Sequence, residues 1–211
     1  MTFDRFDDVL VKRLLRALPP EANAYLFGSR VYDAHSIQSD HDFQVIVADK
    51  KLKEFTSKPS INSRFTDLHV HSQTEFQDAL NKHEPYAVET FFLPREFRFV
   101  EGLKLTFVLD KKKMRHAFSE NASHSWVKGK KKLTVPESLN EWIGKKSIYH
   151  AFRMIDYAIQ IGETGMISNY ASCNDILVEL SEMGSDWTTI DATMRPRFNA
   201  LMTKFREVCP K

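Results

Sequence analysis

The chain is poor in the features that mark secreted, fibrous or membrane-spanning proteins. Its 211 residues include 2 cysteines, Cys173 and Cys209, which have neither CxxC nor any other metal-ligand spacing. No apolar run approaches the roughly 18 residues that a membrane span needs, and the sequence contains no internal repeat or low-complexity linker. The N-terminal segment is acidic, where a signal peptide would be basic and then apolar. We therefore expect a reduced, cytoplasmic protein that does not enter a membrane.

The charge of the chain is distributed unevenly along its length. Composition is ordinary for a globular protein, with 42% hydrophobic and 27% charged residues, and the length suits one large domain or two small ones. Residues 104–153 carry 12 Lys and Arg against 4 Asp and Glu, whereas residues 1–103 carry 13 against 16 and residues 154–211 carry 5 against 8. A basic middle between acidic flanks indicates a polyanionic partner, either nucleic acid or the triphosphate of a nucleotide; the alternative is a solvated lysine face.

The hydrophobic pattern predicts a mixed α/β first half. Apolar runs of strand length, rich in β-branched residues, occur at residues 23–27 and 43–48, and residues 65–71 alternate as a strand does. Helical spacing occurs at residues 4–18 and, in two pieces joined near Pro85, at residues 74–93.

The second half of the chain has a different character. Residues 104–110 alternate briefly, residues 111–133 are basic and interrupted by polar residues, and the pattern from Pro136 onward is helical. Two apolar stripes run along that helical part, one of Ile148, Phe152, Ile155 and Ile159 and one of Met194, Phe198, Leu201, Phe205 and Val208. We expect an α/β (α+β) domain over residues 1–103, and a basic connecting segment with a C-terminal helical region over residues 104–211.

The chemically informative segment is LFGSRVYDAHSIQSDHDFQVIV, residues 26–47. Gly28 lets the backbone approach a ligand closely because it lacks Cβ. Ser29 and Arg30 then open a helix whose N-terminal amides suit a phosphate. Asp40 and Asp42 are two residues apart at a strand start, so their carboxylates are expected on one face. Paired oxygen donors are what Mg²⁺ needs when it also binds substrate phosphates.

Asp67 is the expected third carboxylate. It begins the strand at residues 65–71 and shares one face of it with His69 and His71. Imidazole is the wrong donor type beside a Mg²⁺ site lined by carboxylates. We therefore interpret the two histidines as site-wall residues or exposed strand residues.

The spacing of these residues resembles a known signature. Gly-Ser, ten residues and then Asp-His-Asp, followed by a strand-borne Asp, resembles the DNA polymerase β-like nucleotidyltransferase superfamily. The chain is similar to small stand-alone members related to the minimal nucleotidyltransferases and to RNA-repair-associated proteins. The resemblance is strongest over residues 24–47 and extends to about residue 93. Many members carry a second glycine shortly after Gly-Ser, where this chain has Asp33 or Ala34.

The resemblance implies a nucleotidyltransferase palm, with a small mixed sheet and flanking helices, followed by a helical region. It also implies transfer of a nucleoside monophosphate from a nucleoside triphosphate (NTP) to a hydroxyl, with release of pyrophosphate. Two Mg²⁺ or Mn²⁺ ions would be held by Asp40, Asp42 and Asp67. The expected nucleotide-binding residues are Gly28, Ser29, Arg30, Ser39 and Lys146.

Two basic features of the second half support a polyanionic ligand. Lys146, His150, Arg153 and Tyr157 share one helix face, from which Lys146 could reach the triphosphate. Lys128, Lys130, Lys131 and Lys132 accompany Trp126 and could bind a nucleic-acid strand through phosphates and stacked bases. For both, the alternative is a solvated basic surface, with Trp126 anchored in the core.

Three functions remain open at this point. The acceptor is RNA or another nucleic-acid end, which the basic middle segment favours. Alternatively, the acceptor is a small molecule or a protein. In the third case the chain binds nucleotide without turnover, against which the presence of all three carboxylates counts.

Overall fold

The computed structural model describes residues 12, 14–35, 39–56 and 66–210. Of the helix predicted over residues 4–18, residues 12 and 14–17 are helical and Leu18 is a bend, whereas residues 4–11 and 13 lie outside the described residues. The chain forms two compact units. The first contains Met1–Asn81 and Thr90–Phe107, and the second contains Lys82–Glu89 and Val108–Lys211.

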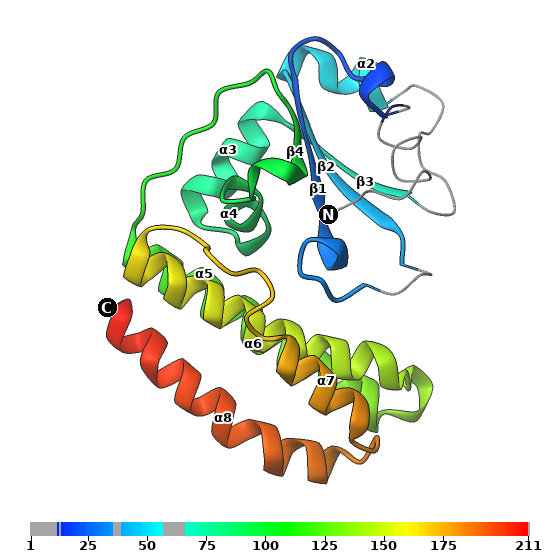
Figure 1. Cartoon of the computed structure of the whole chain (residues 1–211), viewed down its shortest axis with the longest axis vertical. Coiled ribbons are helices and arrows are strands. Elements are labelled where there is room, and N and C mark those ends of the chain that lie inside the picture. The colour runs from blue at the N-terminus through cyan, green and yellow to red at the C-terminus, as the bar shows by residue number, and fades with distance from the viewer. Residues whose placement is uncertain (1–11, 13, 36–38, 57–65, 211) are drawn as a thin grey trace. The chain divides into compact units, whose positions relative to one another are not determined.

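The first unit contains a mixed four-stranded sheet with the order β3-β2-β1-β4 (Figure 1). Its strands are β1 (Ala22–Phe27), β2 (His41–Val47), β3 (Thr66–Ser72) and β4 (Arg98–Glu101). Strands β2 and β3 run parallel, whereas β1 is antiparallel to both β2 and β4. The three strands predicted from the sequence are confirmed. Strand β2 is central and apolar, and its residues Phe43, Val45, Ile46 and Val47 are buried.

Strand β4 was not predicted. It has four residues, pairs with β1 only, and its register with β1 shifts between Ala24 and Tyr25. Phe99 and Val100 are the apolar residues of β4, and charged Arg98 and Glu101 flank them. An edge strand of this length buries too little to leave a periodic apolar signal.

Helices of the first unit follow the strands closely. They are η1 (Gly28–Arg30), η2 (Asp49–Lys51), α2 (Leu52–Thr56), α3 (Gln73–Lys82) and η3 (Arg95–Phe97). Helix α3 buries Phe76, whose ring lies 5.6 Å from that of His71 on β3. The predicted break near Pro85 is confirmed, because α3 ends at Lys82 and α4 (Pro85–Phe91) begins at the proline. The chain passes between the two units after Asn81, near the end of α3, after Glu89, inside α4, and after Phe107.

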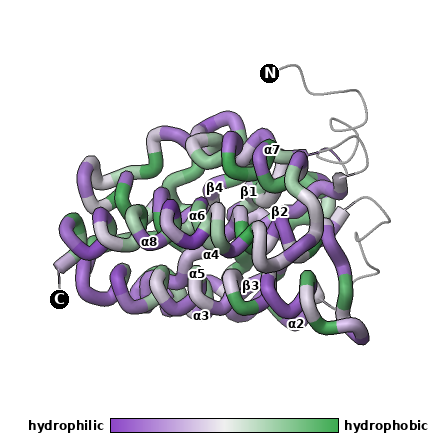
Figure 2. Tube along the Cα trace, turned by 90° about the horizontal axis from the view of Figure 1, so that it is seen from below, coloured by the Kyte–Doolittle hydropathy of each residue, from purple (hydrophilic) through white to green (hydrophobic). Residues whose placement is uncertain are grey.

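The second unit is helical. It contains α5 (Lys111–Thr134), η4 (Pro136–Ser138), α6 (Glu141–Thr164), α7 (Asn174–Glu182) and α8 (Trp187–Val208). The predicted stripe on α6 is fully buried, and in the α8 stripe Met194, Phe198 and Phe205 are buried. Along these helices hydrophilic and hydrophobic residues alternate (Figure 2). None of the described helices combines the length and the apolar content that crossing a membrane requires.

Residues 111–133, which we expected to be a basic connecting segment, form most of helix α5. The Asp110 side chain caps the helix by accepting from the backbone N–H groups of Lys112 and Lys113, each at 3.0 Å. The apolar residues of the helix recur at the helical spacings of three and four, but the lysines and polar residues between them mask that period in the sequence. The buried face of α5 is carried by Met114, Ala117, Phe118, Ala122, Trp126 and Leu133.

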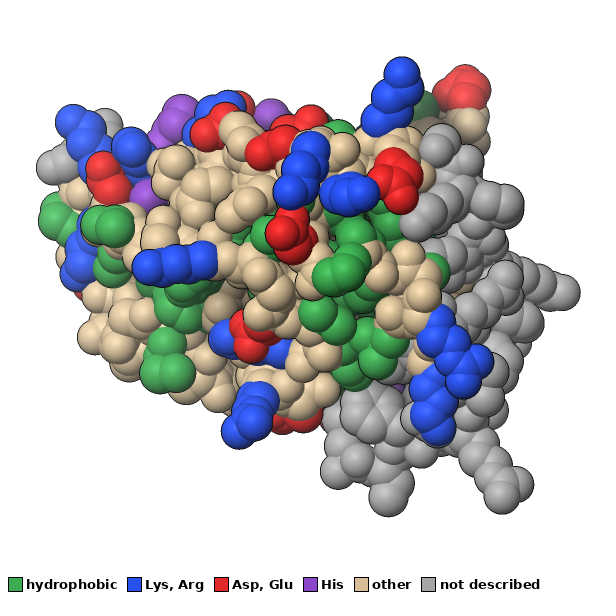
Figure 3. Space-filling view, turned by 90° about the horizontal axis from the view of Figure 1, so that it is seen from above, with side chains coloured by type: hydrophobic (Ala, Val, Ile, Leu, Met, Phe, Trp, Pro, Cys, Tyr) green, Lys and Arg blue, Asp and Glu red, His purple; other side chains and the backbone are tan. Residues whose placement is uncertain are grey.

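Helices α5 and α6 cross closely at a pair of glycines. A Cβ placed at Gly129 would lie 2.7 Å from Ile148 Cγ1, and one placed at Gly144 would lie 2.7 Å from Leu133 Cγ. The crossing therefore requires a residue without a side chain on both helices. Elsewhere on the molecule, basic, acidic and apolar side chains are interspersed on the face shown in Figure 3.

Candidate metal centre

The candidate site lies at the end of the sheet where β1 finishes and β2 begins. Phe27, the last residue of β1, pairs with Asp42, and Asp42 in turn pairs with Asp67 in the parallel register of β2 and β3. Two of the three predicted carboxylates are thus cross-strand neighbours, although they lie 25 positions apart in the sequence. Side chains at paired positions share a face of the sheet, so this register places the carboxylates together.

A third side chain completes the group. Ligand atoms of Asp42, Asp67 and His69 all lie within 4.8 Å of one another, and His69 Nε2 is 3.6 Å from Asp67 Oδ2. His69 is two residues beyond Asp67, and the alternation of a strand puts both on one face. Asp42 is half-buried, whereas Asp67 and His69 are exposed.

His69 is an exposed strand residue, which is one of the two interpretations made from the sequence, and it also lies close enough to both carboxylates to be a possible ligand. The shared face with Asp67 was the available sequence signal, and the preference of Mg²⁺ for oxygen was the reason for setting it aside. His71, on the same face, instead lies 3.0 Å from Gln44 Oε1 through its Nε2. Burial, and secondarily the neighbouring His69, lower the pKa of His71, while Glu75 acts in the opposite direction.

Gly28 lies directly against the side chain of Asp42. It adopts φ +79°, in the left-handed region, and a Cβ built on it would lie 2.0 Å from Asp42 Oδ2. Close approach was the predicted reason for a glycine here, and the group that approaches is a carboxylate of the chain itself. The turn after β1 therefore supports the position of Asp42.

The segment that leads into β2 is held by Arg30. Its guanidinium donates from Nη2 to the carbonyl of Ser39 at 2.9 Å and from Nε to the carbonyl of Asp40 at 3.2 Å. Asp40 is exposed, precedes the first residue of β2, and does not belong to the group formed by Asp42, Asp67 and His69. Ser29 is buried within η1.

Asp33 is one of the two residues at which the signature that the chain resembles would have a second glycine, and its backbone is left-handed. Asp33 adopts φ 55°. Asp is one of the few residues besides glycine that visits this region routinely. The difference from the signature that the chain resembles is therefore compatible with a turn that needs a positive φ.

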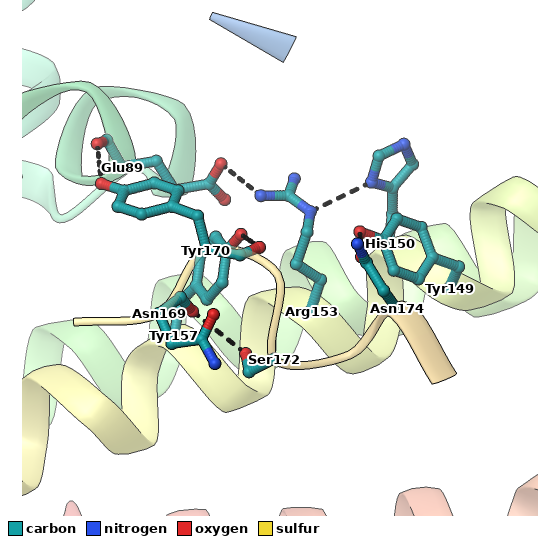
Figure 4. Close-up of polar contacts among 9 residues, drawn as sticks. All are labelled: Glu89, Tyr149, His150, Arg153, Tyr157, Asn169, Tyr170, Ser172 and Asn174. Atoms are coloured by element: carbon teal, nitrogen blue, oxygen red, sulfur yellow. Dashed lines mark hydrogen bonds and ion pairs between the residues drawn. The ribbon is translucent and has the colours of Figure 1, made fainter. Parts of the chain in front are cut away.

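Within the second unit, the predicted cationic face of α6 is only partly exposed. Lys146 and His150 are partly exposed, but Arg153 and Tyr157 are buried. Arg153 Nη1 donates to Glu89 Oε2 at 2.6 Å, and its guanidinium lies 4.9 Å from the centre of the Tyr157 ring (Figure 4). Arg153 is thus turned toward Glu89, a carboxylate 64 positions away in the sequence, and is not available on the surface of α6.

Further hydrogen bonds surround this ion pair. The Tyr170 hydroxyl donates to the Glu89 carbonyl at 2.7 Å, and the Tyr157 hydroxyl donates to the Tyr170 carbonyl (Figure 4). Arg153 Nε lies 3.3 Å from His150 Nδ1 and donates to it. Burial, followed by the charges of Arg153, Lys146 and Lys128, lowers the pKa of His150 well below its usual value.

In the basic segment of α5 the lysines reach the solvent, whereas the tryptophan is buried. Lys128, Lys130 and Lys131 are exposed and Lys132 is partly exposed. Trp126 is buried, stacked 4.8 Å from the Phe198 ring centre, with the Arg195 guanidinium 4.7 Å from its own ring centre. Trp126 is therefore a core residue, which agrees with the alternative in which it anchors the core.

The donor set of Asp42, Asp67 and His69 fits a divalent cation. Two carboxylates and one imidazole on one face of two adjacent strands provide hard oxygen ligands and one nitrogen ligand. Without a cation the carboxylates would repel each other, and a bound cation would relieve that repulsion. Neither a known protein family nor a curated protein matches this chain.

Proposed function

We propose that this chain is a cytoplasmic nucleotidyltransferase, whose first unit is a DNA polymerase β-like palm. It transfers a nucleoside monophosphate from an NTP to a hydroxyl acceptor and releases pyrophosphate. The observation that carries the proposal is the pairing of Asp42 with Asp67, beside a Gly28 turn that leaves space for the Asp42 carboxylate. If these aspartates only capped turns at the surface, nothing would require their side chains to lie at paired positions on adjacent strands.

Asp42, Asp67 and His69 would hold the divalent cation, Mg²⁺ or Mn²⁺. When bound there, the cation supplies charge neutralisation at the triphosphate and lowers the pKa of the attacking hydroxyl. Asp40 is exposed and lies two residues before Asp42. Because side chains two residues apart in an extended chain lie on the same face, Asp40 is on the side of the chain that faces the group. In our proposal Asp40 turns toward Asp42 and serves a second ion when nucleotide is bound.

The turn after β1 would bind the phosphates. Gly28–Arg30 forms a short helical turn whose backbone amides suit an anion, and Ser29 and Ser39 contribute hydroxyl groups near it. Arg30 keeps the Ser39 and Asp40 backbone in place.

The chemical step is an in-line displacement at the α-phosphorus. A bond forms between the acceptor oxygen and the α-phosphorus, the bond from that phosphorus to the bridging oxygen of pyrophosphate breaks, and the acceptor proton passes to solvent. Asp67 would orient the acceptor side of the site, and Asp40 and Asp42 the triphosphate side.

We favour RNA or another nucleic-acid end as the acceptor, because residues 104–153 carry the excess of positive charge. A small-molecule or protein acceptor is the second candidate. An RNA acceptor predicts that binding weakens steeply as salt concentration rises, whereas a small acceptor does not. Loss of turnover with retention of nucleotide binding would leave the third candidate, a non-catalytic member of the fold.

The test is incubation of the protein with each NTP labelled at the α-phosphate, with Mg²⁺ or Mn²⁺, and with RNA, a metabolite pool or protein as acceptor. The proposal predicts label in one acceptor class for the wild type and none for Asp42→Asn or Asp67→Asn. Asp78→Asn, an exposed aspartate on α3, serves as the matched control and keeps full activity. Transfer that survives Asp42→Asn would overturn the proposal.

A further inference from the structure

Helix α6 begins with an exposed tryptophan. Trp142 is 52% exposed, although tryptophan is rarely left in water on a protein surface without a partner. One and two turns further along α6, on the same face, lie Lys146 and His150, both partly exposed. From Gly144 to Ala151 the other residues of the helix are buried. The exposed face of α6 is therefore a narrow line of an aromatic ring, an ammonium and an imidazole.

Helix α5 contributes two more cations on the side next to α6. The carbonyl of Lys132 accepts from the backbone N–H of Asn140 at 2.9 Å, which places Lys132 at the start of α6, near Trp142. One turn earlier, Lys128 lies close enough to His150 for its charge to act on the imidazole, as Lys146 also does. Lys130 differs, because its ammonium lies 5.9 Å from the ring centre of Trp187 on α8.

The cations of this face are available to a ligand. Within the part of the chain that the structure describes, Lys128, Lys132 and Lys146 form no ion pair. Two acidic residues are nearby, Glu137 on η4 and Glu141 on α6. Glu141 is already bound to Lys145, with 2.5 Å between Oε1 and Nζ. The face therefore keeps an excess of positive charge beside an exposed ring.

We propose that Trp142, Lys146, Lys128 and Lys132 form a binding face for single-stranded RNA. An aromatic ring among lysines matches a strand that offers alternating bases and phosphates, since the ring stacks on a base and the ammonium groups contact phosphates. Paired bases in a duplex cannot stack on the ring, so the face discriminates against double strands. The inference rests on the proposed function only in making this strand the acceptor, since binding itself needs no turnover.

Leu139 and Ile143, close to Trp142 in the sequence, are also exposed, so the alternative occupant of this face is an apolar surface of another protein. An apolar protein interface would depend on all three side chains and would be insensitive to the lysines. Stacking on bases depends on the aromatic ring alone and on the cations. Variants of the individual residues therefore separate the two occupants.

The experiment measures binding of a labelled oligouridylate of about 16 nucleotides, within the range of known single-strand sites, without NTP or metal. Binding should quench the fluorescence of the exposed indole. Trp142→Ala should lower affinity about tenfold, whereas Trp142→Phe should keep most of the affinity and lose the quenching. Leu139→Ala, which removes apolar surface but no ring, should bind as the wild type does.

The salt dependence tests the cations. Combining Lys128→Ala with Lys146→Ala should reduce the slope of log affinity against log salt by about 1.4, at roughly 0.7 for each phosphate contact. Lys112→Ala on the first turn of α5 should leave the slope unchanged. The same oligouridylate paired with oligoadenylate should bind more weakly than the single strand. The proposal would be overturned if Trp142→Ala kept wild-type affinity, if the duplex bound as tightly as the single strand, or if Leu139→Ala and Trp142→Ala lost affinity equally. A failed transfer assay with intact oligouridylate binding would count against the proposed function alone.

Discussion

Gly28 and Asp42 share a space that holds only one side chain. The Cβ position of Gly28 lies 2.0 Å from Asp42 Oδ2, and the φ of Gly28 is +79°. Since Asp42 is also the cross-strand partner of Phe27 and Asp67, the turn, the sheet register and the candidate metal group depend on the same few atoms.

Replacing Gly28 should therefore damage both stability and metal binding. In Gly28→Ala the methyl group forces the Asp42 carboxylate to move, in addition to the roughly 1–2 kcal/mol cost of a side chain in the left-handed region. Gly165→Ala provides the control, because Gly165 has φ +82° but no atom within 4 Å of its Cβ position. Urea unfolding and Mn²⁺ titration should show the larger stability loss, and a loss of Mn²⁺ binding, in Gly28→Ala only. Equal effects of the two variants would mean that the contact with Asp42 is unimportant.

His69 should influence which metal binds. Imidazole is a better ligand for Mn²⁺ than for Mg²⁺, so His69→Ala should weaken Mn²⁺ binding about tenfold, or about 1.4 kcal/mol, and Mg²⁺ binding less. The matched control is His116→Ala, which removes another exposed histidine beside a carboxylate, 3.7 Å from Glu120 Oε2. Isothermal titration calorimetry with each metal measures the difference. Identical losses for the two metals would place His69 outside the ligand set.

Removing one partner of the Glu89–Arg153 ion pair should strongly lower the free energy of unfolding, whereas replacing both residues with apolar ones should lower it much less. Both side chains are at least 94% buried, so Glu89→Gln leaves a buried guanidinium without its counter-charge. Removing one partner of such a pair typically costs about 3–5 kcal/mol. The double variant Glu89→Leu with Arg153→Met should recover much of that loss, as measured by urea denaturation. A double variant no more stable than Glu89→Gln would show that the surrounding hydrogen bonds need both charges.

Acid should destabilise the protein partly through His150. Its pKa is lowered in the folded state, so below the ordinary value near 6.5 the unfolded chain binds a proton that the folded chain does not. Stability is therefore greatest above pH 6.5 and falls as pH decreases, by at most about 1.4 kcal/mol per pH unit for one proton. His71, whose pKa is also lowered, adds to this slope. His150→Gln should show a shallower decline between pH 7 and 5, because glutamine can accept from Arg153 without titrating. An unchanged slope would contradict the role of His150.

The central strands and the two carboxylates were predictable because their signals are local. Apolar runs fix β1 and β2, and the alternation in β3 places Asp67 and His69 on one face. The cross-strand register that brings Asp42 to Asp67 is not local, yet the motif spacing anticipates it. The preference of Mg²⁺ for oxygen ligands led us to leave His69 out of the expected ligand set, although the alternation of β3 already places it on the same face as Asp67.

Other parts could not be predicted, for reasons that are also physical. Helix α5 is rich in lysine and serine, which mask its apolar period in the sequence, and it packs closely against α6 at Gly129 and Gly144. The burial of Arg153 depends on Glu89, which local spacing cannot reveal. Asp40, which the motif groups with Asp42, lies outside the group that the structure brings together.

The most direct test of nucleotidyl transfer compares two positions of the label in the same NTP. Wild-type protein, Mg²⁺ or Mn²⁺ and RNA are incubated with NTP labelled at the α-phosphate or, in parallel, at the γ-phosphate. Nucleotidyl transfer predicts that α-label appears in the acceptor and γ-label in pyrophosphate, with both signals absent in Asp42→Asn and present in Asp78→Asn. Transfer of γ-label to the acceptor, or undiminished transfer of α-label by Asp42→Asn, would contradict the account.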